Sequence, residues 1–385
     1  MKDRISTAAR SVPPSGIRKF FEMVLGMPEV ISLGVGEPDF VAPWHIREAC
    51  IYSLEKGYTM YTSNYGLLEL REEISKFYNQ WHNLDYNPES EILITTGVSE
   101  GYDLAIRALV NPGDEVLIPE PSYVSYKPCT VFAGGKPVVV TTNAEDEFKV
   151  RAENLRAAVT EKSKAMVINY PNNPTGATMT KKELEEIADI AVEHDLTVIS
   201  DEVYGRLTYE GRHTPFSSLE GMRERTAILD GFSKAYAMTG FRIAFSLAPE
   251  DITDAMMKVH QYTMLCAPIT GQMSAIEALR NGEREVATMT REYNRRRRVI
   301  VKRLNEIGLT CFTPKGAFYA FPSIKSTGLS SEEFSTQLLK SKKVAVVPGT
   351  AFGECGEGHI RCSYATSMED LKTALNRIED FTKSL

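Results

Sequence analysis

Residues 231–242 read Gly-Phe-Ser-Lys-Ala-Tyr-Ala-Met-Thr-Gly-Phe-Arg, and they follow a short apolar run from Thr226 to Leu229. Such a run is typical of a fully buried parallel strand, which places Lys234 just past the strand end. A lysine taken out of water can form a Schiff base with an aldehyde, and the nearby Arg242 can hold a phosphate with its planar guanidinium. The stretch therefore indicates a ligand with both groups, although a surface lysine beside an unrelated arginine fits it equally well.

A second strand-like run, Leu196 to Ser200, ends in Asp201-Glu-Val-Tyr204. In open α/β sheets, ligands bind at the carboxyl ends of the strands, which is where Asp201 would lie. Pyridoxal 5'-phosphate (PLP) is both an aldehyde and a phosphate, and its pyridine nitrogen stays protonated beside a fixed carboxylate. Tyr204 could hydrogen-bond the phenolic oxygen of the same ring. A helix cap or a solvated turn is the alternative for this acidic pair.

Two more strand–turn–helix junctions carry candidate ligands. The turn Tyr170-Pro-Asn-Asn-Pro-Thr-Gly176 is stiff, so it can present the Asn173 amide rigidly. The stretch Thr95-Thr-Gly-Val-Ser-Glu-Gly101 opens a helix, where backbone N–H groups and the helix dipole favour a phosphate. Each pattern alone also fits an ordinary connection between a strand and a helix. A dinucleotide fingerprint is excluded, because Asp39 stands where the third glycine after Gly34-Val-Gly would fall.

In their order along the chain, these clusters resemble the class I aminotransferases, which are fold-type-I PLP enzymes, and specifically their prokaryotic aspartate and aromatic subgroup. The resemblance runs from about Ile31 to Glu379. The further stretches that carry it are ISLGVGEPDF at 31–40, YT at 61–62, GLLELR at 66–71, VAVVPG at 344–349 and HIRCSYA at 359–365. The resemblance implies amino-group transfer in two half-reactions, with PLP as the cofactor.

The resemblance also implies roles for single residues. Lys234 would be the Schiff-base lysine, Asp201 would pair with the pyridine nitrogen, and Tyr204 would contact the ring oxygen. Tyr123 would stack on the cofactor ring in the offset geometry that aromatic rings prefer. The other implied ligands are Asn173 at the ring oxygen, Ser233 and Arg242 at the phosphate, and the backbone of Val98, Ser99 and Glu100 at the same phosphate. Tyr61 would reach the phosphate of the neighbouring subunit, so each site would need a homodimer.

For the substrate, the resemblance implies a clamp on the α-carboxylate. Arg361 would bind this group bidentately, and the backbone of Gly36 would close over it, with Asn173 beside it. Residues 13–21 resemble the mobile N-terminal piece that covers the substrate in relatives, and Ile17 of this segment would line the side-chain pocket. Lys234 would move the proton at the substrate Cα as general base and then acid.

The sequence departs from the family pattern at Gly231 and Ser99. Gly231 stands where many relatives carry a hydroxyl or amide residue, and Ser99 stands where aspartate-specific members often carry a lysine for the distal carboxylate. With Ile17 and Phe20, this predicts a largely apolar pocket. We therefore expect an aminotransferase for aromatic amino acids or a broad range of them, with 2-oxoglutarate as the expected acceptor. The alternatives are an aspartate aminotransferase, a PLP carbon–sulfur lyase, and a PLP sensor, which would need a helix-turn-helix that about 30 leading residues cannot supply.

Composition narrows the class further. The chain has 385 residues, 43% of them hydrophobic and 25% charged, and a net charge of -7, which argues against nucleic acid or an acidic membrane as a partner. The basic run 295–298 fits a solvated helix face. The six cysteines have no disulfide-framework spacing, and neither a signal-peptide core nor a run of 18 apolar residues occurs, so the expected location is the cytoplasm. The group Cys355, His359 and Cys362 lacks a second pair for zinc, and no metal is expected.

The pattern of elements predicts the α/β class. Strand-like and helix-like runs alternate from about residue 48 to 285, as βαβ units require, and a long helix is expected over 291–307. The family architecture implies a large PLP-binding domain with a mostly parallel seven-stranded sheet over residues 46–285. A smaller α+β domain would combine residues 1–45, which include the mobile N-terminal segment, with residues 286–385.

Overall fold

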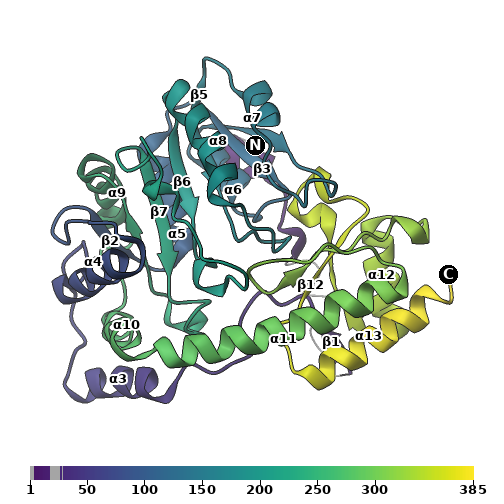
Figure 1. Cartoon of the computed structure of the whole chain (residues 1–385). Helices are drawn as coiled ribbons and strands as arrows, with labels where there is room; N and C mark the ends of the chain where they lie inside the picture. Colours follow the sequence, from purple (N-terminus) through teal and green to yellow (C-terminus); the bar gives the residue numbers. More distant parts are fainter. Residues whose placement is uncertain (1–3, 18–26, 28) are drawn as a thin grey trace.

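The computed structural model describes residues 4–17, 27 and 29–385, and its centre is a seven-stranded sheet (Figure 1). The strand order is β2-β8-β7-β6-β5-β3-β4, and β8 runs antiparallel to both of its neighbours while the other pairs are parallel. The strands are β2 (Ile92–Thr95), β3 (Glu115–Glu120), β4 (Lys136–Thr141), β5 (Ser163–Ile168), β6 (Thr197–Asp201), β7 (Thr226–Gly231) and β8 (Ala244–Leu247). The predicted α/β class and mostly parallel sheet are confirmed.

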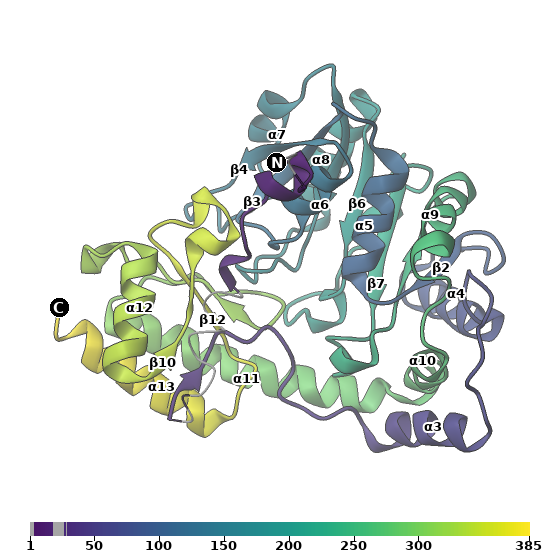
Figure 2. The same cartoon turned by 180° about the vertical axis from the view of Figure 1, so that it is seen from behind.

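Helices cover both faces of this sheet, which explains why its strands are apolar on both sides. In β3, Val116 and Ile118 pack into a core with one group of helices, while Leu117 packs into a second core on the other face. The first group is α5 (Val98–Leu109), α6 (Tyr126–Phe132) and α9 (Glu250–Thr263). The second is α7 (Ala152–Ala158) and α8 (Lys181–Glu193), with α4 (Leu68–His82) and α10 (Ile269–Asn281) in a neighbouring core. Figure 2 shows α5 and α9 from their side of the sheet.

A smaller α+β unit lies at the far end of one long helix, α11 (Glu283–Ile307) (Figure 1). Its antiparallel sheet has the order β11-β12-β9, and a separate parallel pair joins β1 to β10. This parallel pair joins a strand that precedes the large sheet in the sequence to a strand that follows it. The elements are β1 (Ile31–Ser32), β9 (Tyr319–Ala320), α12 (Ser331–Lys342), β10 (Val344–Ala345), β11 (Val347–Pro348), β12 (Ile360–Ser363) and α13 (Met368–Thr382).

The structure places the start of the long helix earlier than the sequence predicts. The helix expected over 291–307 begins at Glu283, and α3 (Trp44–Glu55) begins just before residue 46. The predicted domain limits at 45/46 and 285/286 therefore fall inside two helices, and the division itself stays a prediction. Near the N-terminus, α1 (Thr7–Ser11) contacts α6. Residues 13–17 of the segment expected to cover the substrate, Ile17 included, are described, whereas residues 18–21, Phe20 included, lie outside the described residues.

Candidate active site

The carboxyl ends of the parallel strands open into a cavity of about 1250 Å³, which the smaller unit closes from the other side. Asp201 is the last residue of β6, Asn169 follows β5, and Lys234 follows β7 by three residues. All three line the cavity, as expected for side chains at this edge of an open α/β sheet. The predicted residues that also line it are Ile17, Gly36, Val98, Ser99, Tyr123, Asn173, Tyr204, Ser233, Arg242 and Arg361.

Lys234 is partly buried, and its side chain lines the cavity. Its Nζ donates a hydrogen bond of 2.8 Å to the carbonyl oxygen of Gly36. Burial lowers the pKa of Lys234 to about 8, and although Glu37 opposes this shift, the charges of Arg361 and Arg242 add to it. A large fraction of the amine is therefore neutral near pH 8, as a nucleophile toward an aldehyde requires.

Asp201 is held as a buried carboxylate at the same edge of the sheet, at the end of the neighbouring strand. The hydroxyl of Tyr126 donates a 2.6 Å hydrogen bond to its Oδ2, and the backbone N–H of Val203 donates to Oδ1 at 3.3 Å. Burial raises the pKa of Asp201 to about 6, while these two hydrogen bonds oppose the rise, so the group is mostly ionised at pH 7. Tyr126 is a residue whose role the sequence did not predict.

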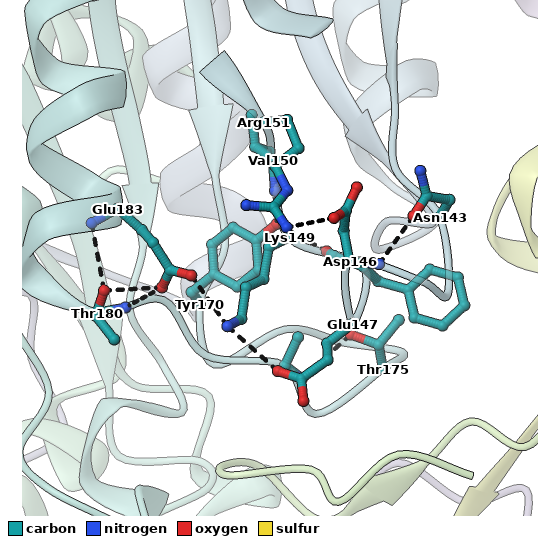
Figure 3. Close-up of polar contacts among 12 residues, drawn as sticks. Asn143, Asp146, Glu147, Lys149, Val150, Arg151, Tyr170, Thr175, Thr180 and Glu183 are labelled. Carbon is teal, nitrogen blue, oxygen red and sulfur yellow. Dashed lines mark hydrogen bonds and ion pairs between the residues drawn. The ribbon is translucent and has the colours of Figure 1, made fainter. Parts of the chain in front are cut away.

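The turn that carries Asn173 is braced on both sides. The hydroxyl of Tyr170 accepts from the N–H of Val150 and donates to the carbonyl of Phe148, each at 3.0 Å. At the other end, Thr180 and Glu183 form a reciprocal cap at the start of α8, and Lys149 bonds Glu183 at 3.1 Å (Figure 3). These contacts support the prediction of a stiff turn.

Among the described cations that line the cavity, Arg361 is the most buried, with 2% of its surface exposed. Its Nη1 donates to Oδ1 of Asn173 at 3.0 Å, and its Nη2 donates to the carbonyl of Gly34 at 2.5 Å. Its Nε finds no hydrogen-bond acceptor among the described residues. Burial lowers the pKa of this guanidinium. A buried arginine with a free donor that lines a cavity is suited to a carboxylate from outside the chain.

Backbone N–H groups gather with Arg242 at the start of α5. Arg242 donates to the carbonyls of Thr96 and Thr239, at 3.0 and 2.9 Å. Gly97 has a φ of +118°, and a Cβ there would lie 2.4 Å from Arg242 Nη2, so a glycine is required for this close approach. The arrangement combines a helix N-terminus with a cation, which is what a phosphate needs.

The departure at Gly231 has a steric cause. A Cβ at Gly231 would lie 2.6 Å from the Cβ of Ala244 on the neighbouring strand, which leaves no room for the side chain that many relatives carry there. The other departure, Ser99, lines the cavity, where its hydroxyl lies 3.3 Å from the hydroxyl of Tyr123.

Two predicted site residues do not line this cavity. The N–H of Glu100 donates to the Gly97 carbonyl at 3.0 Å, and its carboxylate bonds Thr96 and His260, so its backbone is not free for a phosphate. Tyr61 is 82% exposed on the outside of the chain. Its predicted contact is with a neighbouring subunit, which a single chain does not display.

The donor set fits the expected cofactor. The sheet edge offers both a lysine that loses its proton near pH 8 and a buried carboxylate. A helix N-terminus with an arginine lies at the same cavity. In the described part of the chain, no group of three or more His, Cys, Asp or Glu side chains could hold a metal ion, and no helix is long and apolar enough to cross a membrane.

Comparisons with known proteins agree with this geometry. The family "Aminotransferase class I and II" matches residues 28–378. The chain is 48% identical to aromatic-amino-acid aminotransferase 2 of Thermococcus litoralis, over 98% of both proteins, and 49% identical to an aspartate aminotransferase of Pyrococcus abyssi, over 98% of this chain and 97% of the other. The solved aromatic aminotransferase of Pyrococcus horikoshii superposes with a TM-score of 0.91 at 48% identity, covering 96% of this chain and 99% of the other. The chain therefore belongs to the class I and II aminotransferases, and it is a PLP-dependent transferase of amino groups.

Proposed function

We propose that this aminotransferase takes the amino group from L-amino acids with apolar side chains, aromatic ones above all, and passes it to a 2-oxo acid, with 2-oxoglutarate as the expected acceptor. The observation that carries this proposal is the charge of the cavity wall. Among the described residues, the cations that line it are Lys127, Lys234, Arg242 and Arg361. The last three belong to the cofactor and α-carboxylate positions, and Lys127 is already paired with the buried carboxylate of Glu120. A second substrate carboxylate would therefore have to compete with Glu120 for Lys127.

The apolar part of the pocket supports the same donors. Ile17 and Ala351 pack against a small core that contains Phe352, and these three residues and Tyr123 line the cavity. An aromatic side chain would bury its faces against such a wall. An aspartate aminotransferase remains the second candidate, because the Pyrococcus abyssi relative with that name is as similar as the aromatic one.

The geometry of the cavity supports a role for each of these residues. Lys234 would bind the cofactor covalently and then, as a free amine, move the proton at the substrate Cα, for which a pKa of about 8 is well placed. Bound PLP supplies the electron sink for the pair left at Cα. The ionised Asp201 would hold the pyridine nitrogen protonated, Tyr204 and Asn173 would bond the ring oxygen, and Tyr123 would cover the ring.

The remaining ligands divide between phosphate and substrate. Ser233, Arg242 and the first N–H groups of α5 at Val98 and Ser99 would hold the phosphate. The N–H of Glu100, already bonded to Gly97, makes Glu100 the weakest member of the predicted set. Arg361 would bind the α-carboxylate beside Asn173, with the backbone of Gly36 over it and Ile17 at the side chain.

The homodimer is part of the proposal. Exposed apolar side chains gather on α3, the loop after it and the end of α9, and Asn64 bonds the carbonyl of Leu265 to hold the last two together. These elements lie on the side of the sheet away from the smaller unit (Figures 1 and 2). The exposed residues are Trp44, Ile51, Tyr52, Leu54, Tyr58, Met60, Tyr61, Tyr262, Met264 and Leu265. An apolar surface of this kind indicates a protein partner, and a second copy would bring in the Tyr61 hydroxyl. All six cysteines are free, which supports a cytoplasmic location.

The experiment is a donor panel of aspartate, tyrosine, phenylalanine and alanine against 2-oxoglutarate, with kcat/KM as the readout. We expect the kcat/KM values for tyrosine and phenylalanine to exceed those for aspartate and alanine. A wide preference for aspartate would refute the apolar pocket and point to a cation such as Arg18 or Lys19, which lie outside the described residues. Pyruvate formed from cysteine or cystathionine without a keto acceptor would indicate the lyase instead. A Ser99→Lys variant adds a second test, since it should raise the kcat/KM for aspartate relative to that for phenylalanine.

A further inference from the structure

We propose that Tyr319 is a positioning residue that serves both substrate and cofactor: its hydroxyl orients the hydroxyl of Tyr204, and its ring holds the guanidinium of Arg361. The inference rests on the proposed roles of these two partners and goes beyond them, because Tyr319 itself was not predicted from the sequence. It lines the active-site cavity and is fully buried, with 0% of its surface exposed.

The hydroxyl contact is short and enclosed. The hydroxyl oxygens of Tyr204 and Tyr319 lie 2.7 Å apart, and both side chains are buried. If Tyr319 donates in this pair, the proton of Tyr204 is free to point at the oxygen of the cofactor ring. A hydrogen bond that accepts at Tyr204 also strengthens the bond that Tyr204 donates, since such chains are cooperative in a low-dielectric site.

The ring contact acts on the substrate clamp. The Cζ of Arg361 lies 4.6 Å from the centroid of the Tyr319 ring and 4.8 Å from that of Phe352. A desolvated guanidinium gains from such aromatic faces, and the two rings restrict the plane in which the guanidinium can meet a carboxylate. The strands explain the proximity: Tyr319 is paired with Ser363, two residues from Arg361 and on the same face of β12.

Gly36 completes the arrangement. A Cβ at Gly36 would lie only 2.9 Å from the Tyr319 hydroxyl, so the backbone that closes over the substrate lies directly on this residue. The carbonyl of the same glycine accepts the hydrogen bond of Lys234. Tyr319 thus contacts Tyr204, proposed for the ring oxygen, and Arg361, proposed for the α-carboxylate. It also lies against Gly36, whose carbonyl bonds Lys234, the residue proposed for the proton transfer.

The alternative is that Tyr319 only fills the core, where it also packs on Phe318 with the ring centroids 4.9 Å apart. Two variants separate the roles. Tyr319→Phe keeps the ring and loses the hydroxyl, whereas Tyr319→Leu loses both, with Tyr319→Met in its place if the leucine variant does not fold. The matched control is Tyr364→Phe, which removes another fully buried hydroxyl of the same core, one bonded to the carbonyl of Ala317 at 3.2 Å and outside the cavity.

The first readout is the pH titration of the visible absorbance of the holoenzyme. A bond donated by Tyr204 stabilises the anionic ring oxygen and so lowers the pKa of the bound chromophore. We therefore expect Tyr319→Phe to raise its midpoint by about half to one pH unit, as the loss of one neutral hydrogen bond implies. The Tyr364→Phe control should titrate like the unmodified protein. A Tyr319→Phe titration that coincides with the control would overturn the hydroxyl role.

The second readout is the dissociation constant of unreactive carboxylates, propionate and 3-phenylpropionate, measured from the same absorbance. Tyr319→Leu should weaken both by about 5- to 30-fold, the range expected for one desolvated cation–π contact, whereas Tyr319→Phe should stay within about twofold. Unchanged binding in Tyr319→Leu would overturn the ring role. Propionate carries only the carboxylate, so an error in the proposed donor class would alter 3-phenylpropionate binding without changing the propionate comparison between variants.

Discussion

The two walls of the cavity are built in different ways. The sheet-edge wall takes Asp201, Asn169 and Lys234 from the ends of strands, so the backbone topology alone brings them together. The wall of the smaller unit joins Arg361 and Tyr319 from paired short strands to Gly36 from a distant part of the chain, and side-chain contacts hold it. In the proposed function the first wall would face the cofactor and the second would face the substrate, so we expect substitutions in them to fail in different ways.

The largest effect is expected at Lys234 on the sheet-edge wall. Lys234→Ala should still bind PLP without a covalent bond but lose transamination by at least about 10⁴-fold, because the general base is gone. The measurement is single-turnover conversion of a donor amino acid. Lys136→Ala, an exposed lysine on β4, is the control and should keep normal activity. Turnover of Lys234→Ala within tenfold of the control would contradict the assignment.

Asp201 tests whether charge or shape matters on the same wall. Asp201→Ala should lower kcat by about three orders of magnitude, since removing one partner of a buried charge pair costs about 3–5 kcal/mol. Asp201→Asn keeps the shape and a hydrogen-bond acceptor for Tyr126, but it should lose nearly as much because the fixed charge is absent. An Asn variant with near-normal turnover and bound PLP would exclude the electrostatic role.

Arg361 tests the substrate wall. Arg361→Ala should lower kcat/KM on the order of 10²-fold for every donor, because all donors share the α-carboxylate and a truncated charge pair costs about 2–5 kcal/mol. The ratio between phenylalanine and aspartate should barely change. Arg361→Lys should recover only part of the loss, since an ammonium lacks the planar fork. A loss confined to one donor would move Arg361 from the α-carboxylate to the side-chain pocket.

A pH dependence of the apoprotein is the last expected effect, and it amounts to about tenfold for each pH unit. Burial lowers the pKa of Lys234 from 10.5 to about 8, so the neutral amine dominates above pH 8 and decreases about tenfold per unit below it. The rate of covalent PLP capture, followed by stopped-flow absorbance, should therefore be about 100-fold lower at pH 6 than at its plateau. A midpoint near 10.5 would mean that the lysine is solvated.

The same contrast between the walls decides how much the sequence reveals. Asp201 and Lys234 each follow an apolar run, so their place at the sheet edge is predictable from local pattern. Arg361 and Gly36 needed the family resemblance, because no local pattern joins them. Tyr126 and Tyr319 were missed, since their partners Asp201 and Tyr204 lie 75 and 115 positions away and only the folded chain brings each hydroxyl to its partner.

Two details of the predictions depend on local hydrogen bonds and helix ends. Glu100 was expected to offer its N–H to a phosphate, but the first turn of α5 already uses that group at the carbonyl of Gly97. The start of α11 was placed at residue 291 instead of Glu283, although Glu283 and Glu285 provide the acidic first turn that a helix N-terminus favours. Helix ends depend on hydrogen bonds that a pattern of apolar residues does not encode.

The central claim is that the lysine at the end of β7 carries the cofactor. Borohydride reduction of the yellow holoenzyme, followed by proteolysis and mass spectrometry, tests it directly. The account predicts one peptide that carries reduced PLP, modified at Lys234. Recovery of the label at Lys127, a second lysine that lines the cavity, or at any other lysine would contradict it.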